Sequence, residues 1–464
     1  MASMVYHDLN SFESINPYTG EKFARFELLT DSELDKTLIK SQEAFLKWRK
    51  TSLKERLALI NALSNLLNEE ATTYGQTISL EMGKPLREAI AEVKKCAVAC
   101  KYYVEHAPSH LKPRKVPLET GRTGEVRYEP LGVILGIMPW NFPFWQVIRF
   151  AIPTLAAGNV VMVKHAPNTP RSALMLQQLF ARAGFPVGIY TNLFISIPQV
   201  SSLIARSEIA GVSLTGSTRA GRAVAALAGQ HLKPSVLELG GSNSLIALPD
   251  APVQKVVEHA VNARFMNAGQ SCISAKRIFV PKDKYETYIK ELTIRIKRLK
   301  MGNPLMDDTH IGPVARLDLA EQLEKQVNAS VELGARVHIG AQRNGTIFTP
   351  TLLTHVKPGM PAFDEELFGP VAVLIGYSSD KEVVQLANNT PYGLGTALFT
   401  EDVEHAKKLI PKFQDGAVYI NEWIHSDPRL PFGGVKDSGY GRELSEEGIR
   451  AFVNVKSVVV NSAF

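Results

Sequence analysis

The sequence predicts an α/β fold with two Rossmann-like parallel-sheet domains and a small β arm. Short apolar runs rich in Val, Ile and Leu alternate with amphipathic helical segments, as in parallel sheets that are covered on both faces. Two glycines near residue 240 divide this alternation into two series, and a β-branched run lies close to the C-terminus. The chain of 464 residues, with 45% apolar and 21% charged residues, is long enough for two large folded domains.

Charge and hydropathy exclude several classes of protein. The net charge of +6 comes without a run of like charges or a basic patch interleaved with aromatic residues, so no nucleic-acid partner is expected. The longest mainly apolar stretch, residues 147–163, is interrupted by Arg149, Pro153, Gly158 and Asn159, which argues against a membrane span. The first ten residues lack the basic and apolar parts of an export signal, which favours a cytoplasmic location. Three cysteines cannot build a disulfide framework, and no metal site is expected.

The first half of the chain opens with helices and continues as strands. Residues 31–103 carry apolar side chains at three- and four-residue spacing, which predicts amphipathic helices. Residues 124–139 change from alternation to an apolar run, as an exposed strand followed by a buried strand would. Buried-strand patterns return at residues 157–167 and 209–217, each followed by a helical segment. This order predicts the first parallel sheet.

The second series begins after the glycines at 240 and 241, where the chain can change direction. Its apolar strands are expected at residues 276–281, 370–377 and 416–421, before a Gly-rich stretch at residues 431–443. The β-branched tail at residues 452–460 needs another strand to pair with. A second subunit is the favoured partner, and an edge of the same chain is the alternative.

Three motifs place useful side chains at the ends of predicted strands. They are PWNFPFW from residue 139, LELGG from residue 237 and GQSC from residue 269. Open α/β sheets bind ligands at the carboxyl ends of their strands, so the three motifs are candidates for one site.

Together with SINPYTGE at 14, VKHAP at 163, LTGSTRAG at 214, EELFGPV at 365 and PFGGVKDSGYGRE at 431, these motifs resemble those of the aldehyde dehydrogenase superfamily. The resemblance spans nearly the whole chain in the family's order. Within the superfamily, the sequence is most similar to the short bacterial succinate-semialdehyde dehydrogenases.

Catalysis of aldehyde oxidation requires a nucleophile, an oxyanion site and a base. Thiolate is the strongest side-chain nucleophile near neutral pH, which favours Cys272 over its alternative as a small buried residue. The resemblance implies that Asn141 and the main chain of Cys272 stabilise the oxyanion, although Asn141 could be a turn residue. It also implies that Glu238 is the base that activates water for thioester hydrolysis. The alternative for Glu238 is a structural ion pair, since a carboxylate in a buried strand needs a partner or a function.

A nicotinamide nucleotide is the expected cofactor, either NADP or NAD. Gly216 and Ser217 lie between an apolar strand and a helix, where free N–H groups suit a pyrophosphate. The resemblance places Glu366 on the nicotinamide ribose and Phe368 near the ring. The remaining residues that it implies around the nucleotide are Trp140, Asn141, Lys164, His165, Ala166, Pro167 and Leu239.

Position 167 departs from the pattern of many NAD-preferring relatives, which carry Glu there. A carboxylate at this position accepts the adenosine 2'-hydroxyl and repels a 2'-phosphate. The chain has Pro167 instead. The barrier to NADP is therefore absent, although proline supplies no phosphate donor.

Arg149 is the candidate for binding the far end of the substrate. It stands in an apolar helical segment and should need an anion, which is either a substrate carboxylate or an internal carboxylate. The resemblance favours the substrate, because short succinate-semialdehyde dehydrogenases carry arginine at this position. Ser426 is a second candidate donor, whereas Met266 occupies a position where some longer relatives have another arginine.

The predicted function is NAD(P)-dependent oxidation of succinate semialdehyde to succinate through a cysteine thiohemiacetal and a thioester. Oxidation of another short aldehyde, such as glutarate semialdehyde or an aliphatic one, is the alternative within the class. A cofactor-independent cysteine esterase and a non-catalytic binding protein are alternatives of other classes. The expected assembly is a homodimer or a dimer of dimers. The predicted segments are residues 1–112 with 132–238 for the nucleotide-binding domain, 239–432 for the catalytic domain, 113–131 with 448–464 for the oligomerisation arm, and 433–447 for a connection.

Overall fold

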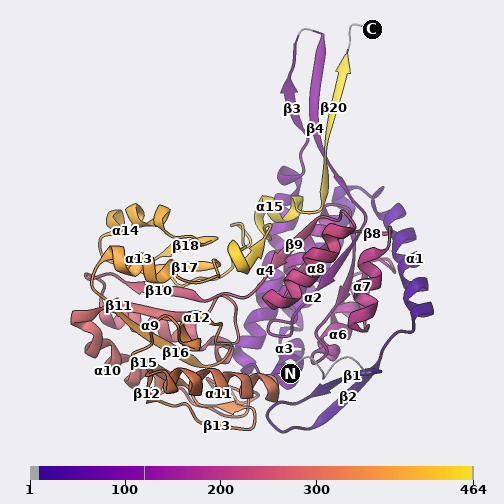
Figure 1. Cartoon of the computed structure of the whole chain (residues 1–464). Coiled ribbons are helices and arrows are strands. Elements are labelled where there is room, and N and C mark those ends of the chain that lie inside the picture. Colours follow the sequence, from indigo (N-terminus) through magenta and orange to yellow (C-terminus); the bar gives the residue numbers. More distant parts are fainter. Residues whose placement is uncertain (1–9, 120, 462–464) are drawn as a thin grey trace.

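The computed structural model describes residues 10–119 and 121–461 and has two α/β lobes and a projecting arm (Figure 1). One lobe contains a six-stranded sheet with strand order β19-β9-β8-β5-β6-β7, and the other contains a seven-stranded sheet with order β12-β15-β16-β11-β10-β17-β18. The arm is a three-stranded sheet with order β20-β4-β3. The predicted fold class is therefore confirmed.

The first lobe begins with a hairpin and four helices. The hairpin pairs β1 (Ser11–Ile15) with β2 (Lys22–Glu27). Capping boxes at Thr30 and Ser52 start the first two helices, because each hydroxyl accepts from a backbone N–H three residues on and a glutamate there closes the box. The helices are α1 (Asp31–Trp48), α2 (Leu53–Glu69), α3 (Ala71–Met82) and α4 (Leu86–His110).

The six-stranded sheet has five parallel strands and one short antiparallel edge strand. Its parallel strands β5, β6, β8 and β9 are almost entirely buried, which explains their continuous runs of Val, Ile and Leu. The strands are β5 (Val133–Ile137), β6 (Val160–Lys164), β7 (Tyr190–Leu193), β8 (Ile209–Thr215), β9 (Ser235–Glu238) and β19 (Gly439–Tyr440), and the helices are α5 (Trp145–Ala156), α6 (Pro170–Arg182), α7 (Ile197–Ala205) and α8 (Thr218–Gln230).

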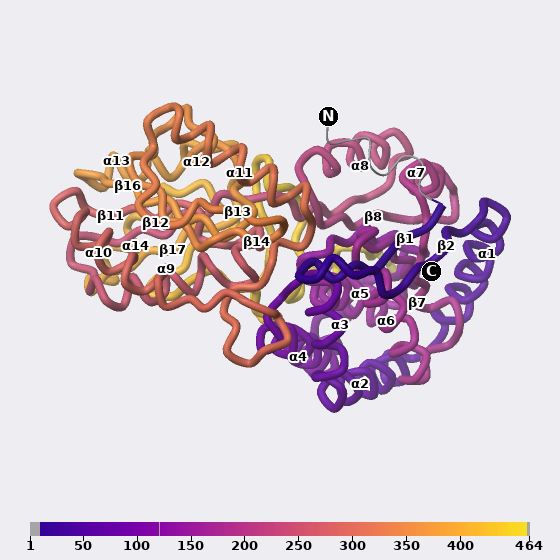
Figure 2. Tube along the Cα trace, turned by 90° about the horizontal axis from the view of Figure 1, so that it is seen from below, coloured from indigo at the N-terminus to yellow at the C-terminus, as the bar shows by residue number. Residues whose placement is uncertain are grey.

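The seven-stranded sheet is parallel except at its β12 edge. Its strands are β10 (Asn243–Ala247), β11 (Ala275–Pro281), β12 (Arg336–Ile339), β15 (Thr351–Thr354), β16 (Val371–Tyr377), β17 (Gly395–Phe399) and β18 (Ala417–Ile420). The helices of this lobe are α9 (Val253–Phe265), α10 (Tyr285–Ile296), α11 (Leu317–Glu332), α12 (Pro361–Asp364), α13 (Asp380–Asn388) and α14 (Val403–Leu409). From below, the hairpin of β13 (Arg343–Asn344) and β14 (Ile347–Phe348) lies on the side of this lobe that faces the β1–β2 hairpin (Figure 2). A hydrogen bond of 2.5 Å from Thr346 Oγ1 to the Pro17 carbonyl joins the two hairpins.

The C-terminal tail finds a partner strand within its own chain. After α15 (Ser445–Arg450), β20 (Val453–Asn461) pairs antiparallel with β4 (Arg122–Pro130) of the same chain, and β4 also pairs with β3 (Arg114–Pro117). The alternative, pairing with an edge of the same chain, is confirmed. Because β20 is the outer strand of the arm, pairing of its other edge with a second subunit stays a prediction. Nine residues of β20 meet nine of β4 in continuous register, so the chain itself supplies the complete partner strand.

Among the described helices, none is both long enough and apolar enough to cross a membrane.

Candidate active site

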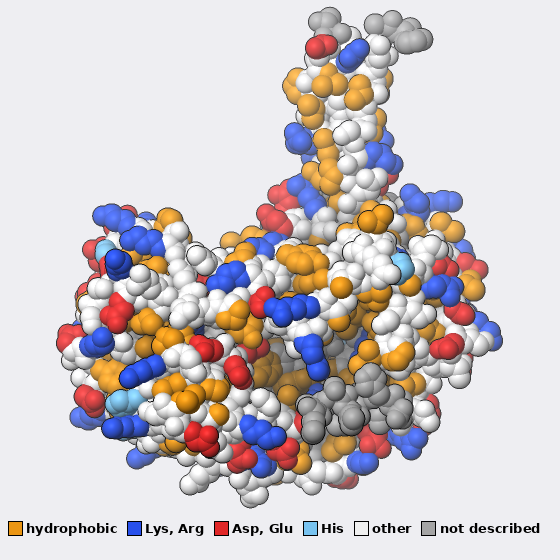
Figure 3. Space-filling view, viewed as in Figure 1, with side chains coloured by type: hydrophobic (Ala, Val, Ile, Leu, Met, Phe, Trp, Pro, Cys, Tyr) orange, Lys and Arg blue, Asp and Glu red, His pale blue; other side chains and the backbone are white. Residues whose placement is uncertain are grey.

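The three predicted strand-end motifs converge where the two lobes meet. Asn141 follows β5, Glu238 ends β9, and Cys272 lies just before β11. A cavity of about 250 Å³ contains Cys272, Arg149 and Ser426 in its wall. The surface of the protein is hollowed between the lobes (Figure 3).

The loop before Cys272 is held in a strained shape. Asn267, Ala268 and Gly269 have φ angles of 54°, 51° and 72°, in the left-handed region that costs energy for residues with a side chain. Buried Arg264 fastens the loop, because its Nη1 donates to the Gly269 carbonyl at 3.1 Å and to Ser274 Oγ at 2.6 Å. The turn that precedes the nucleophile is therefore held by hydrogen bonds from a buried arginine.

Asn141 is tied to this loop. Its Nδ2 donates to the Gln270 carbonyl at 3.1 Å, and its own carbonyl accepts from Asn267 Nδ2 and from Lys84 Nζ, each at 2.9 Å. An amide nitrogen has two N–H groups, so one of them remains for an oxyanion beside Cys272. The two halves of the predicted oxyanion site are thus connected through the backbone of the nucleophile loop.

Glu238 is a buried carboxyl group, with 2% of its surface exposed. Neither carboxyl oxygen has a hydrogen-bond partner among the described residues. Burial raises the pKa of Glu238 well above its ordinary value, Arg149 opposes the rise, and Glu443 adds to it. A Cβ on Gly433 would lie 2.7 Å from Glu238 Oε1, so glycine is needed there for the carboxyl group to fit. The raised pKa makes the ionised carboxylate a stronger base, but Glu238 must lose its own proton before it can accept one from water.

The Cys272 thiol is protonated at neutral pH in this setting. Burial raises its pKa to about 11, and the positive charges of Lys276 and Arg149 partly offset that rise. Lys276 Nζ donates to the Ser271 carbonyl at 2.8 Å and to the Cys272 carbonyl at 2.9 Å. Ionisation of the thiol therefore requires a base or a further positive charge.

Lys276 also joins the nucleophile to Glu366. The ammonium lies 3.1 Å from Glu366 Oε1, which in turn accepts from the Gly241 N–H at 3.1 Å. A side chain at Gly240 would collide with Glu366, and one at Gly241 would collide with the Cys272 carbonyl. The two glycines therefore allow the chain after β9 to lie close to both Glu366 and Cys272.

Arg149 lies in the cavity wall with only 2% of its side chain exposed. Its guanidinium forms an ion pair with Glu443, a buried carboxylate from the Gly-rich segment. It also contacts Thr215 Oγ1 at 3.4 Å and lies over the Phe432 ring at 4.7 Å. The internal carboxylate, one of the two anions that the sequence left open, is thus present.

Ser426 faces the same cavity and accepts a 2.7 Å hydrogen bond from Lys95 Nζ. The sequence did not single out Lys95, Lys276 or Glu443. Lys95 follows another lysine in a helix with many charges, and Lys276 precedes an arginine, so neither stands out by pattern. Glu443 ends the GYGRE stretch, where a buried acid beside glycines was a usable signal.

Most of the predicted cofactor residues lie at or just after the carboxyl ends of strands of the six-stranded sheet, whereas Glu366 and Phe368 come from the other lobe. The Trp140 and Phe368 rings meet edge to face with centroids 5.7 Å apart. Lys164 ends β6, is 8% exposed, and has no hydrogen-bond acceptor or carboxylate among the described residues. Burial lowers the pKa of Lys164 to about 8 and the pKa of His165 to about 3, so His165 is neutral.

The start of α8, where a pyrophosphate is predicted to bind, is held by hydrogen bonds on both sides of its first residue. Ser217 caps the helix by accepting from the Ala220 N–H at 3.3 Å, and the preceding Gly216 donates to the Glu238 carbonyl at 3.0 Å. Leu239 packs against Gly221, where a Cβ would lie 2.5 Å from a Leu239 methyl. This contact holds the helix terminus next to the end of β9.

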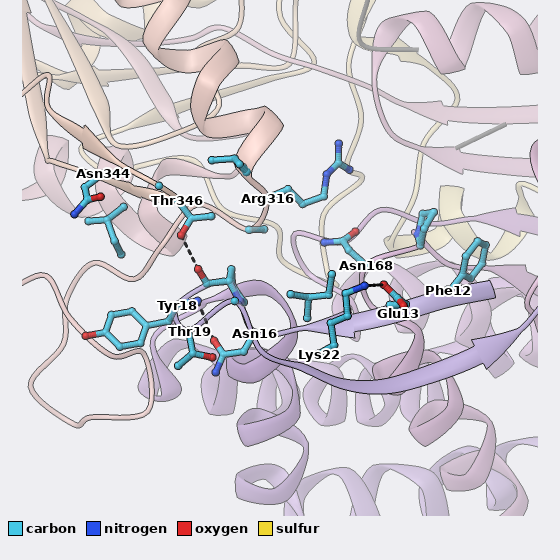
Figure 4. Close-up of a pocket in the computed structure, with 18 of the residues that line it drawn as sticks. Phe12, Glu13, Asn16, Tyr18, Thr19, Lys22, Asn168, Arg316, Asn344 and Thr346 are labelled. Carbon is cyan, nitrogen blue, oxygen red and sulfur yellow. Dashed lines mark hydrogen bonds and ion pairs between the residues drawn. The ribbon is translucent and has the colours of Figure 1, made fainter. Parts of the chain in front are cut away.

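A larger cavity of about 920 Å³ extends from Pro167 and Asn168 to the two hairpins (Figure 4). Figure 4 shows Asn168 and Arg316 on one side and the Glu13–Lys22 ion pair, 2.9 Å long, on the other. Phe12 lines this cavity, and Lys164 Nζ lies 5.5 Å from the centre of its ring. The cavity therefore adjoins the segment that carries the predicted cofactor residues.

Comparison with known proteins decides the family. The profile of the Aldehyde dehydrogenase family matches residues 5–458. The chain belongs to the aldehyde dehydrogenase family. It is 43% identical over 450 residues to the succinate-semialdehyde dehydrogenase (NADP(+)) of Deinococcus radiodurans, covering 96% of this chain and 94% of that protein. It is 42% identical over 452 residues to succinate-semialdehyde dehydrogenase (NADP(+)) 1 of Mycobacterium bovis, and the match covers 96% of this chain and 98% of that protein.

Solved structures of the family agree with this assignment. The structure of succinic semialdehyde dehydrogenase from Streptococcus pyogenes in complex with NADP+ matches with a TM-score of 0.95 at 36% identity. The match covers 97% of this chain and all of that one. The family resemblance seen in the sequence motifs is therefore confirmed.

Proposed function

We propose that this aldehyde dehydrogenase oxidises succinate semialdehyde to succinate with NADP as the acceptor, and with NAD as a second acceptor. The observation that carries the proposal is the convergence of the segments of Asn141, Glu238 and Cys272, with Cys272 in the wall of a cavity that also carries Lys95 and Arg149. The relatives named succinate-semialdehyde dehydrogenase (NADP(+)), at about 42% identity over nearly the full chain, support it.

The cleft fits a nicotinamide nucleotide. Lys164 is a buried ammonium group without a hydrogen-bond acceptor in the described part of the chain, the capped start of α8 suits a pyrophosphate, and Glu366 is held in place by Lys276. We assign cofactor contacts to the following residues: Trp140, Asn141, Lys164, His165, Ala166, Pro167, Gly216, Ser217, Leu239, Glu366 and Phe368. When bound, the nucleotide supplies the acceptor for the hydride. Pro167 places no negative charge near a 2'-phosphate, which favours NADP.

The chain's own residues carry the other steps. The Cys272 thiol gives its proton to ionised Glu238 or to solvent water. Its sulfur then attacks the aldehyde carbon, and a C–S bond forms as the C=O π bond opens to an oxyanion. The free N–H of Asn141 and the Cys272 backbone N–H donate to the resulting oxyanion. Loss of hydride leaves a thioester on Cys272. Glu238 accepts a proton from water as that water attacks the thioester, the C–S bond breaks, and the thiol is restored with release of the acid.

The carboxylate of the aldehyde is bound at the part of the cavity wall that carries Ser426 and the buried cations, Arg149 among them. A short aldehyde without a carboxylate, or glutarate semialdehyde, is the second candidate substrate. The cavity volume of about 250 Å³ suits molecules of this size.

We also propose the domain limits and the assembly. Residues 1–112 and 132–238 form the nucleotide-binding domain, residues 239–432 the catalytic domain and residues 433–447 the connection. Residues 113–131 and 448–464 form the arm, through which two chains, or two pairs of chains, associate. Val455 and Val459 support this role, because each is about 60% exposed on the arm.

Steady-state rates with four aldehydes and both nucleotides test the function. Succinate semialdehyde should give the highest kcat/KM, and reduction should appear as absorbance at 340 nm. Cys272→Ala should abolish oxidation and keep nucleotide binding, whereas Glu238→Gln should accumulate acyl-enzyme, because hydride transfer precedes hydrolysis. Normal turnover by Cys272→Ala, or ester hydrolysis without nucleotide as the main activity, would overturn the proposal.

A further inference from the structure

We infer that Lys95 supplies the unneutralised positive charge that receives the distal carboxylate of the substrate, and that Arg149 mainly holds the internal carboxylates in place. This inference rests on the proposed oxidation of a carboxylate-bearing aldehyde. It assigns a specificity-determining role to a residue of α4 that precedes the catalytic segments in the chain.

The charges that line the 250 Å³ cavity are Glu88, Glu92, Lys95 and Arg149. Two of them already have partners: Arg149 is paired with Glu443, and Glu92 is paired with Lys84. The side chains of both ion pairs are almost fully buried. Within each pair, the two opposite charges neutralise each other at short range.

Glu88 is the third carboxyl group in the cavity wall. Its Oε2 accepts from the Asn267 N–H at 2.6 Å, and burial raises its pKa to about 7. The Glu88 carboxyl group is thus largely neutral below pH 7, where it does not neutralise a positive charge in the cavity wall.

Lys95 differs from the other cation of the wall. Among the described residues, no carboxylate oxygen lies within 4.0 Å of its ammonium group. The ammonium donates to Ser426 Oγ at 2.7 Å and lies 4.3 Å from the centre of the Trp145 ring. Two of its three N–H groups therefore have no hydrogen-bond acceptor, and they can bind both oxygens of a carboxylate or one oxygen and water.

The position of Lys95 also explains why the pKa of its ammonium group is lowered. Burial and the like charge of Arg149 lower the pKa of Lys95 to about 8, while Cys96, Glu92 and Asp427 oppose the shift. An anion that enters beside the ammonium would lower the energy of a charge that is otherwise partly desolvated. Ser426, already in contact with Lys95, can then donate its own hydroxyl proton to the same carboxylate.

The test compares two aldehydes with the same four-carbon chain, succinate semialdehyde and butyraldehyde. Lys95→Met removes the charge and keeps the length, Lys95→Arg restores the charge, and Lys94→Met removes an exposed charge from the adjacent position on the same helix. Lys95→Met should lower kcat/KM for succinate semialdehyde by about ten- to a hundredfold, mainly through KM, and change butyraldehyde less than about threefold. Lys95→Arg should recover most of the loss, and Lys94→Met should behave as the wild type.

Inhibition by succinate gives a second measurement that does not depend on oxidation of the proposed substrate. Succinate should inhibit butyraldehyde oxidation by the wild type, and its inhibition constant should rise by about tenfold or more in Lys95→Met. If the wild type shows no preference for the carboxylated aldehyde, the proposed function fails and this inference fails with it. If the wild type prefers it and Lys95→Met keeps both the preference and the succinate inhibition, only the assignment of Lys95 is wrong.

Discussion

Replacement of Arg149 by methionine tests how the buried carboxyl groups of the site are stabilised. The guanidinium is 2% exposed and the carboxylate of Glu443 is 6% exposed, so the variant would leave Glu443 buried without its cation. Removing one partner of a buried ion pair typically costs about 3–5 kcal/mol of folding free energy. We expect Arg149→Met to destabilise the protein and to reduce oxidation of both succinate semialdehyde and butyraldehyde, because the charge beside Glu238 is lost as well.

Protonation of Glu443 in the variant limits the loss of folding free energy and makes that loss depend on pH. Starting from the ordinary pKa of 4.5, holding this carboxyl group neutral at pH 7 costs at most about 3.4 kcal/mol, and at pH 5 about 0.7 kcal/mol, at about 1.36 kcal/mol for each pH unit. Burial already raises the pKa of Glu443 in the wild type, so the measured difference should lie below these limits. Because the pKa in the folded variant is raised above that of the unfolded chain, the destabilisation should grow as the pH rises from about 4.5 toward 7.

Urea unfolding followed by circular dichroism at pH 5 and pH 7 measures this effect. The second substitution Glu443→Gln in the Arg149→Met background should recover most of the stability at pH 7. Arg222→Met is the matched control, because Arg222 pairs with Asp437 at the surface, where an ion pair contributes at most about 1 kcal/mol. Equal losses at the two pH values, or no recovery in the double variant, would refute the assignment of the Arg149–Glu443 pair as the stabilising contact.

Three further outcomes are expected. Pro167→Glu should shift nucleotide preference toward NAD, since a carboxylate repels the 2'-phosphate of NADP; a wild type with no NADP-dependent rate would contradict this reading of position 167. The rate of alkylation of Cys272 by iodoacetamide should keep rising from pH 7 to pH 10, because the thiol pKa is raised to about 11; a plateau below pH 8 would mean that the thiolate is already formed. Deletion of the residues after Asn454 removes most of β20 and should give monomers or aggregates by light scattering, and an unchanged mass would show that the arm is dispensable for assembly.

Local sequence patterns were sufficient to predict the fold class, the family and the strand ends that meet at the site. Buried parallel strands must be apolar on both faces, so their Val- and Ile-rich runs are visible without coordinates. The motifs at Asn141, Glu238 and Cys272 follow or end such strands, and parallel strands bring their carboxyl ends to one edge of each sheet. Their convergence was therefore predictable from local patterns and from the resemblance.

Which charges neutralise one another follows from the three-dimensional arrangement and not from local sequence patterns. Arg149 and Glu443 are far apart in the sequence, and nothing local shows that α15 and the Gly-rich segment bring them together. The neighbours Lys94 and Lys95 look alike as residues, but the helix turns one to the surface and the other toward the cavity. The tail likewise met the edge of its own chain through a register that the apolar pattern did not specify. Pairing of charges and strands depends on distances between remote segments, whereas strands and helices follow from the spacing of neighbouring side chains.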